Sequence, residues 1–109
     1  MKDDLKYLLH IRECIGRVDE DVAGGRDTFM ASHTVQDAVL RNLQVIAEST
    51  KRLSDHLRAS QPDIDWSGIA GFRNLLVHDY LGVDLAVVWQ VVIDDVPKLK
   101  SAILRCLGP

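Results

Sequence analysis

Residues 34–59 read TVQDAVLRNLQVIAESTKRLSDHLRA, and this stretch decides the fold class. Its apolar side chains recur at steps of three and four residues, as they do along one face of an α-helix. They are Val35, Val39, Leu40, Leu43, Ile46, Ala47, Leu53 and Leu57. Charged residues, among them Asp37, Arg41, Glu48 and Arg52, project from the opposite face, which we interpret as solvated. One long helix that covers a core with one side is therefore predicted.

The same periodicity predicts a helix on the N-terminal side, over about residues 3–22. Gly24 and Gly25 end this helix, because glycine readily adopts the backbone conformations that terminate helices. Residues 26–32 leave room for a short helical turn before the long helix begins.

Two further helices are predicted on the C-terminal side. Pro62 interrupts the periodic pattern, and Asp65 is a suitable N-cap for a third helix that runs to about Tyr80. Gly82 closes the third helix, and Asp84 can cap a fourth.

The C-terminal residues complete the prediction of the fold. Pro97 fits either the first turn of a fifth helix or a kink in one longer helix. Residues 86–93, AVVWQVVI, are rich in β-branched side chains, but the capping residue Asp84 before them favours a helix. A chain of 109 residues has the size of one compact domain. We therefore predict a single all-α domain over residues 1–109, an up-and-down bundle of four or five helices.

Composition limits the function. The formal net charge of −3 excludes an overall basic field, so any contact with RNA must be local. The first residues lack the apolar segment of a signal peptide, and no apolar run is long enough to cross a membrane. Cys14 and Cys106 lack Cys-x-x-Cys spacing, and the four histidines lack the spacing of paired metal ligands. We expect a cytoplasmic protein with reduced, buried cysteines, no membrane contact and no metal or other cofactor.

Residues 71–80, GFRNLLVHDY, place Arg73, His78 and Tyr80 in an otherwise apolar helix. Arg73 lies beside the apolar arc and must extend to solvent or find an anion, because an unpaired buried charge is costly. Tyr80 falls on nearly the same side as Arg73, whereas His78 lies about 140° round the helix from it. One straight helix therefore cannot easily aim both at one phosphate. A joint role requires unwinding near Gly82 or a second copy of the chain, and we predict a composite site in a twofold homodimer.

Each of these side chains also has an ordinary structural interpretation. A histidine at a helix end can interact with the helix dipole, and an arginine can form a salt bridge. A tyrosine at this position can lie at the edge of the core, and Asn74 can hydrogen-bond the imidazole of His78. Periodicity alone leaves the function open.

The stretch from residue 65 to residue 84, DWSGIAGFRNLLVHDYLGVD, resembles the signature of the HepT-like toxin family, a branch of the HEPN superfamily of all-helical ribonucleases. The family pattern is an arginine, four residues, a histidine, one residue and a tyrosine. It corresponds here to Arg73, His78 and Tyr80, with the usual asparagine at Asn74. Similarity extends to YLLHIRECI, VQDAVLRNLQVIAES and VWQVVIDDVPKL, and so covers nearly the entire chain.

The chain departs from the family in one segment. The family commonly shows Ile-Gly-Glu-Ala in its second helix, whereas residues 46–49 read IAES, with Glu48 retained. Ala47 in place of glycine favours the helix but can alter a close contact between helices.

The resemblance implies the toxin of a toxin–antitoxin system, an endoribonuclease that needs no metal ion. In that interpretation His78 accepts the proton of a ribose 2′-OH or donates one to the leaving 5′-oxygen. Arg73 offers its planar set of donors to the phosphoryl oxygens. Asn74 orients the imidazole or contacts phosphate, and Glu48 is a supporting candidate.

The resemblance also implies partners: a second copy of the chain, RNA, and a small nucleotidyltransferase antitoxin that attaches AMP to Tyr80. Anionic phosphates beside Arg73 would block RNA by occupancy and repulsion. The competing interpretation is a non-catalytic helical bundle that binds and regulates a nucleotidyltransferase. The acidic net charge favours that alternative mildly, while the complete set of Arg73, His78 and Tyr80 favours a nuclease.

Overall fold

The computed structural model describes residues 2–79 and 82–108. Its helices are α1 (Lys2–Asp21), α2 (Arg26–Ala31), α3 (His33–Lys51), α4 (Asp55–Ala59), α5 (Trp66–His78), α6 (Leu85–Gln90) and α7 (Val96–Leu107), and a π-helical segment, η2 (Val91–Asp95), joins the last two. No strand occurs among the described residues, which confirms the all-α prediction. The two short helices α2 and α4 add to the predicted number of elements.

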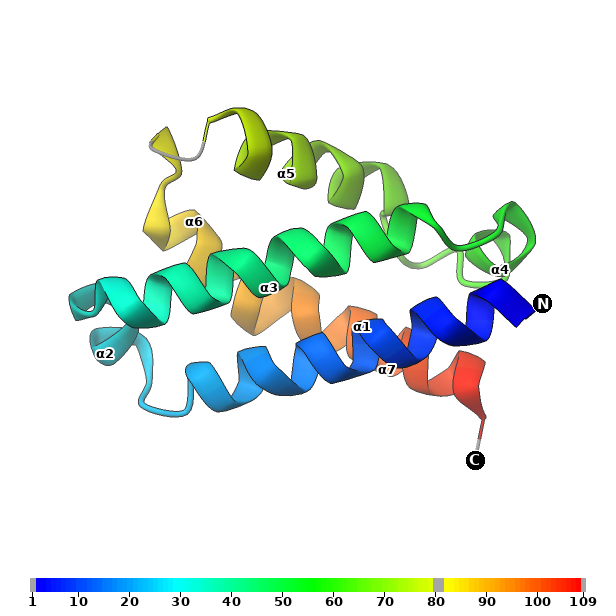
Figure 1. Ribbon diagram of the computed structural model, residues 1–109, viewed down its shortest axis with the longest axis horizontal. Coiled ribbons are helices and arrows are strands. Elements are labelled where there is room, and N and C mark those ends of the chain that lie inside the picture. Colours follow the sequence, from blue (N-terminus) through cyan, green and yellow to red (C-terminus); the bar gives the residue numbers. More distant parts are fainter. Residues whose placement is uncertain (1, 80–81, 109) are drawn as a thin grey trace.

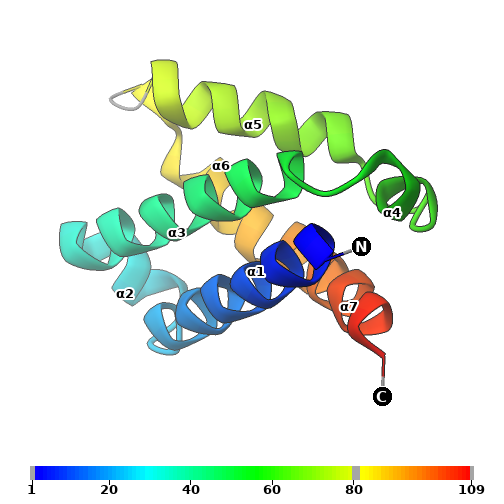
Figure 2. The ribbon, with the colours of Figure 1, turned by 45° about the vertical axis from the view of Figure 1, so that its right-hand side comes forward.

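Helix α3 lies at the centre of the bundle, between α1 on one side and α5 on the other (Figure 1). Helix α1 also packs against α7, which returns across the bundle after α6 and η2. The turned view of Figure 2 shows α5 along the outer side of α3. The motif helix α5 is therefore an outer element of the bundle that packs mainly on α3.

The core is formed by the apolar faces of α1, α3 and the α6–α7 run. Its most completely buried large side chains are Phe29, Ile11, Ile15, Leu76, Ile103, Val18, Val39 and Val88. Helix α2 contributes Phe29, whose ring lies 5.4 Å from that of Trp89 on α6. Gly25 has a φ of 89°, a conformation that L side chains rarely adopt, and it forms the N-cap of α2. This confirms the predicted end of the first helix.

Both cysteines are free thiols. Cys14 is buried and Cys106 is half-buried. Burial is the main reason why the pKa of each thiol is raised, which keeps the sulfur protonated and unreactive.

The prediction of one helix over residues 34–59 is wrong, because the chain turns between α3 and α4. The Ser54 hydroxyl accepts a hydrogen bond from the backbone N–H of Leu57 at 3.1 Å and so caps α4. The turn directs Leu53 into the core, where it is 2% exposed. Ser54 followed by Asp55 is typical of the start of a helix, but the apolar spacing continues across these residues, so the sequence pattern predicted one helix instead of two.

A carboxylate from α1 holds this turn in place. Asp4 accepts hydrogen bonds from the backbone N–H and from the hydroxyl of Ser54, each at 2.7 Å. These bonds, with the hydroxyl as the larger cause, keep the pKa of Asp4 below its ordinary value of 3.8. The side chain is therefore a fixed anion that connects the start of α1 to the start of α4.

Replacing Asp4 with alanine is expected to lower the free energy of unfolding by about 2 kcal/mol, since Ser54 loses both acceptors. Because the folded pKa is lowered, Asp4 stabilises fully above 3.8 and loses that effect as the pH falls through the folded pKa. Urea denaturation should thus show a gap between wild type and Asp4→Ala at neutral pH that narrows in acid. The exposed neighbour Asp3 is the control, and an equal loss in Asp3→Ala would contradict the assignment.

The α6–α7 run is continuous through residues 85–107, with a wider turn in the middle. Pro97 lies in the first turn of α7, directly after the π-helical residues of η2. A proline has no N–H to donate and its ring crowds the carbonyl four residues earlier, and a wider turn relieves that crowding. The sequence allows Pro97 either the first turn of a separate helix or a kink in one longer helix. In the structure Pro97 lies in the first turn of α7, and α7 continues directly from α6 and η2.

Candidate active site

Helix α5 begins at a fixed position. The Asp65 side chain accepts a hydrogen bond from the backbone N–H of Gly68 at 3.0 Å, which confirms the predicted N-cap. The indole N–H of Trp66 donates to the backbone carbonyls of Arg58 and Gln61, at 3.0 Å and 3.2 Å. The helix carrying the motif is therefore anchored at its start to α4 and to the loop that follows it.

Arg73 is directed toward α3 and is only loosely paired there. Its Nη2 lies 3.8 Å from Oε1 of Glu48, and its Nη1 donates to Oδ1 of Asn74 at 3.3 Å. The Nε atom is buried, and no hydrogen-bond partner reaches it within the described part of the chain. The side chain as a whole is 30% exposed. The guanidinium thus retains donors for a further acceptor.

Glu48 does not belong to the solvated face to which we assigned it. Its carboxylate turns toward α5, and the Nε2 of Gln44, one turn earlier on α3, donates to its Oε1 at 3.1 Å. The same oxygen is the one nearest to Arg73. Sequence reasoning missed Gln44, although its spacing of four residues from Glu48 is a signal for a pair on one helix face.

Asn74 lies between the other two motif residues on the surface of α5. It is about 100° round the helix from Arg73 and about 40° from His78. Its side chain accepts from Arg73, and no hydrogen bond between Asn74 and His78 occurs among residues 2–79 and 82–108. The structure therefore joins Asn74 to the arginine, and not to the imidazole as the ordinary interpretation had it.

His78 is exposed and is the last residue of α5. Asp79 follows with φ −136° and ψ 44°, so the helix ends there, about two residues before the predicted end. Tyr80, the expected site of modification, lies outside the described residues. Within one chain the structure thus brings together Arg73, Asn74, Glu48 and Gln44, and leaves the imidazole on another side of the same helix.

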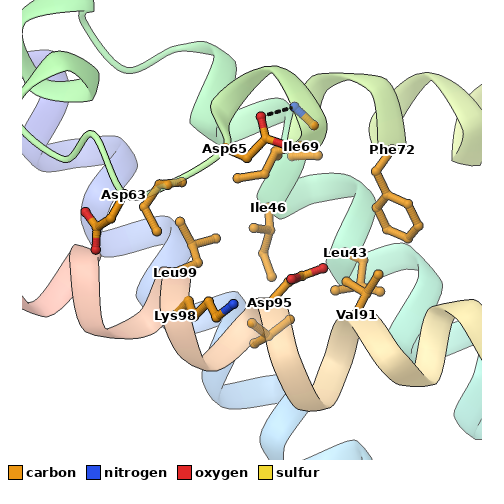
Figure 3. Close-up of a pocket in the computed structure, with 14 residues that line it drawn as sticks. Leu43, Ile46, Asp63, Asp65, Ile69, Phe72, Val91, Asp95, Lys98 and Leu99 are labelled. Carbon is orange, nitrogen blue, oxygen red and sulfur yellow. Dashed lines mark hydrogen bonds between the residues drawn. The ribbon is translucent and has the colours of Figure 1, made fainter.

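A cavity of about 340 Å³ lies between α5, α3 and the η2–α7 run. Figure 3 shows Phe72 and Ile69 of α5 directed into it, opposite Val91 and Leu99. Its lining is mostly apolar and includes none of Arg73, Asn74, Glu48 or His78. The polar cluster around Arg73 is therefore a separate feature from this cavity.

The described residues contain no group of three or more histidine, cysteine, aspartate or glutamate side chains that could hold a metal ion. Among the same residues, none of the helices combines the length and the apolar character that crossing a membrane requires.

Comparison with known proteins identifies relatives over nearly the whole chain. A protein of Methanocaldococcus jannaschii, whose name combines a gamma-glutamylcyclotransferase with an RNase, is 39% identical over 109 residues, which are 98% of this chain and 49% of that protein. The chain thus spans about half the length of that relative.

Two further relatives are closer in length. The "Probable ribonuclease HepT" of Thermococcus cleftensis is 35% identical over 96 residues, which are 87% of each chain. The mRNA nuclease HepT of Shewanella oneidensis is 29% identical over 106 residues, with 75% of this chain and 79% of that protein covered. No solved structure matches the chain.

The family described as "Ribonuclease HepT-like" matches residues 11–106, which include α3, α5 and all four motif positions. With this match and the relatives above, the all-helical chain belongs to the HepT-like ribonuclease family.

Proposed function

We propose that the protein is the toxin of a toxin–antitoxin pair and that it cleaves RNA, without a metal ion, at a cleft between two copies of the chain. The observation that carries the proposal is the state of Arg73. Its charge lies at the protein surface, with a buried Nε that no partner reaches in the described part of the chain and with long contacts at Nη1 and Nη2. Such a guanidinium has donors to spare for the oxygens of a phosphodiester. Membership of the HepT-like ribonuclease family supports RNA as the substrate.

The second copy supplies what one chain lacks. Arg73 and His78 lie on different sides of one helix, so a single copy does not converge on one phosphate. Leu75 and Val77, which precede His78 on α5, are 40% and 38% exposed. Apolar side chains exposed on the motif helix are consistent with a surface that a partner covers. A twofold homodimer would place two copies of each motif residue at one interface.

The proposed reaction is an internal transfer at phosphorus. The 2′-oxygen of a ribose forms a bond to the adjacent phosphorus, and the bond from phosphorus to the 5′-oxygen breaks. At each composite site the imidazole of His78 from one copy takes the proton of the 2′-OH, and the imidazolium so formed protonates the leaving oxygen, while Arg73 comes from the other copy. Arg73 stabilises the negative charge on the phosphoryl oxygens. The products are a 2′,3′-cyclic phosphate and a 5′-hydroxyl end.

Incubation of the purified protein with end-labelled RNA in EDTA tests this function. We expect cleavage, with cyclic phosphate at the new 3′ ends. His78→Ala protein, purified in the same way, controls for contaminating nucleases. Equal cleavage by both proteins, or cleavage that requires an added divalent cation, would reject the proposed mechanism.

The protein is proposed to be neutralised by a nucleotidyltransferase antitoxin that modifies Tyr80. The phenolic oxygen attacks the α-phosphorus of ATP, AMP is transferred and pyrophosphate leaves. Tyr80 follows His78 by two residues in the sequence, and the added phosphate is proposed to block the phosphate of RNA by occupancy and repulsion.

Replacing Tyr80 with phenylalanine is expected to abolish the AMP adduct, because the chain then lacks the attacking hydroxyl. The measurement is a mass spectrum after incubation with ATP and the nucleotidyltransferase encoded beside this chain. Tyr7→Phe is a matched control, since Tyr7 is the second of the two tyrosines in the chain. The Tyr7→Phe variant should still carry the AMP adduct. An adduct that remains in Tyr80→Phe would place the modification elsewhere.

A non-catalytic subunit of a nucleotidyltransferase is the second candidate function, and the net charge of −3 favours it. In that case the protein binds the nucleotidyltransferase and changes its rate, while no RNA is cleaved by wild-type protein in EDTA. The cleavage assay therefore separates the two candidates.

A further inference from the structure

Gln44 contacts the candidate site at one atom. Its Nε2 donates to Oε1 of Glu48 at 3.1 Å, and this same oxygen lies 3.8 Å from Nη2 of Arg73. Gln44 and Glu48 are one turn apart on α3, which runs beside α5 (Figure 1). A short chain of polar contacts therefore leads from Gln44 through Glu48 to the guanidinium.

The pair of Glu48 and Arg73 is too weak to fix the arginine by itself. The Glu48 side chain is 43% exposed, and a half-exposed pair at 3.8 Å gains little while it restricts two long side chains. Among residues 2–79 and 82–108 no partner reaches Nε of Arg73, and the polar contacts of its side chain there are those of Nη2 with Glu48 and of Nη1 with Asn74. The hydrogen bond from Gln44 restricts the motion of the Glu48 carboxylate, and so steadies one of these two contacts of Arg73.

We infer that Gln44 is a positioning residue of the proposed nuclease: it holds the carboxylate of Glu48 in the orientation that turns the guanidinium of Arg73 toward the substrate phosphate. This inference rests on the proposed function, because the orientation matters for the reaction only if Arg73 contacts a phosphodiester. Gln44 itself touches neither Arg73 nor the substrate in this arrangement. Its effect passes through Glu48.

The contribution of Gln44 to stability is expected to be small. Pairs of this kind at a spacing of four residues add little to a helix, and Gln44 is only partly buried. Methionine is about as long as glutamine, is an equally good helix former and lacks the N–H donor. Gln44→Met therefore removes the bond to Glu48 and leaves α3 intact.

The first measurement requires no RNA. In a ¹⁵N-labelled protein the Nε–H signal of Arg73, assigned by its loss in Arg73→Lys, should exchange slowly with water because Nε is buried. We expect exchange about threefold to tenfold faster in Gln44→Met, which corresponds to the loss of one hydrogen bond. Asn42→Leu is the matched control, since the Asn42 amide donates to the carbonyl of Ala38 on the same helix, and among the described residues no hydrogen bond joins it to Glu48 or Arg73. Its exchange and its melting temperature should equal those of wild type.

The second measurement is the rate of RNA cleavage. Gln44→Met should lower kcat by about threefold to tenfold with KM unchanged, because the charge of Arg73 still binds phosphate but is less often correctly turned. Gln44→Lys restores a donor to Glu48 and should recover most of kcat. In a Glu48→Met background, Gln44→Met should add no further loss, since no carboxylate or amide oxygen remains at position 48 to connect Gln44 with Arg73.

The outcomes separate the inference from the proposed function. If wild-type protein cleaves no RNA, the proposed function fails, and faster exchange in Gln44→Met still supports the chain of contacts. If wild type cleaves RNA but Gln44→Met matches it in both exchange and kcat, the inference is wrong. An equal additional loss in the Glu48→Met background would also overturn it, because Gln44 would then act by another route.

Discussion

Replacing His78 with alanine is expected to reduce RNA cleavage by about 10²- to 10⁴-fold, the range typical of a lost general acid or base. The reason is that the proposed reaction moves one proton from the 2′-OH and another to the leaving oxygen, and His78 is the exposed motif side chain suited to both transfers. The measurement is the initial rate on labelled RNA in EDTA. The melting temperature should stay near that of wild type, because an exposed residue at a helix end contributes little to stability.

His10→Ala is the control for this variant. His10 is also an exposed histidine on a helix, but it lies on α1 and outside the motif. Its removal should leave the rate unchanged. A similar fall in both variants would indicate a general effect of histidine removal, and no fall in His78→Ala would remove the imidazole from the mechanism.

The second large effect concerns Arg73. We expect Arg73→Ala to lower cleavage by about 10²- to 10³-fold, as does the loss of one donor that stabilises charge in the transition state. A mixture of Arg73→Ala and His78→Ala chains should then regain roughly a quarter of the wild-type rate, because half of the randomly assorted dimers are mixed and each has one complete composite site. Native mass spectrometry after subunit exchange gives the fraction of mixed dimers.

The recovery in the mixture distinguishes a composite site from two independent ones. If each site takes Arg73 and His78 from the same chain, no mixed dimer contains an intact site and the rate stays at the level of the single variants. Mixed dimers without recovered activity would therefore reject the shared cleft, and the absence of any dimer would reject its premise.

Local signals in the sequence predict much of the fold. Asp65 and Asp84 cap α5 and α6 as expected, since the side chain of an N-cap interacts only with its own first turn. The turn at Ser54 escaped prediction because Leu53 and Leu57 continue the apolar period across it. The bond from Ser54 to Asp4 joins residues 50 positions apart, and a window of sequence does not contain that information.

The candidate site is less accessible to such reasoning. The spacing of Arg73 and His78 on one helix follows from the sequence, as does the conclusion that a single copy does not converge on one phosphate. The contact of Glu48 with Arg73 cannot be predicted in this way. A helical projection gives the direction of Glu48 round α3, but it does not show that α5 packs beside that side chain. The spacing of Gln44 and Glu48 is present in the sequence, but their connection to Arg73 depends on the approach of α3 to α5.

The wide turn of η2 makes the length of this segment important. Five residues, Val91–Asp95, carry the chain from the axis of α6 to that of α7. Deleting one of them would rotate every later residue by about 100° relative to the bundle. Leu99, which is 5% exposed, would turn away from the interior, and Lys100 would take its place. Natural insertions and deletions should therefore be rare here, and the loop between α1 and α2 is the more tolerant place for them.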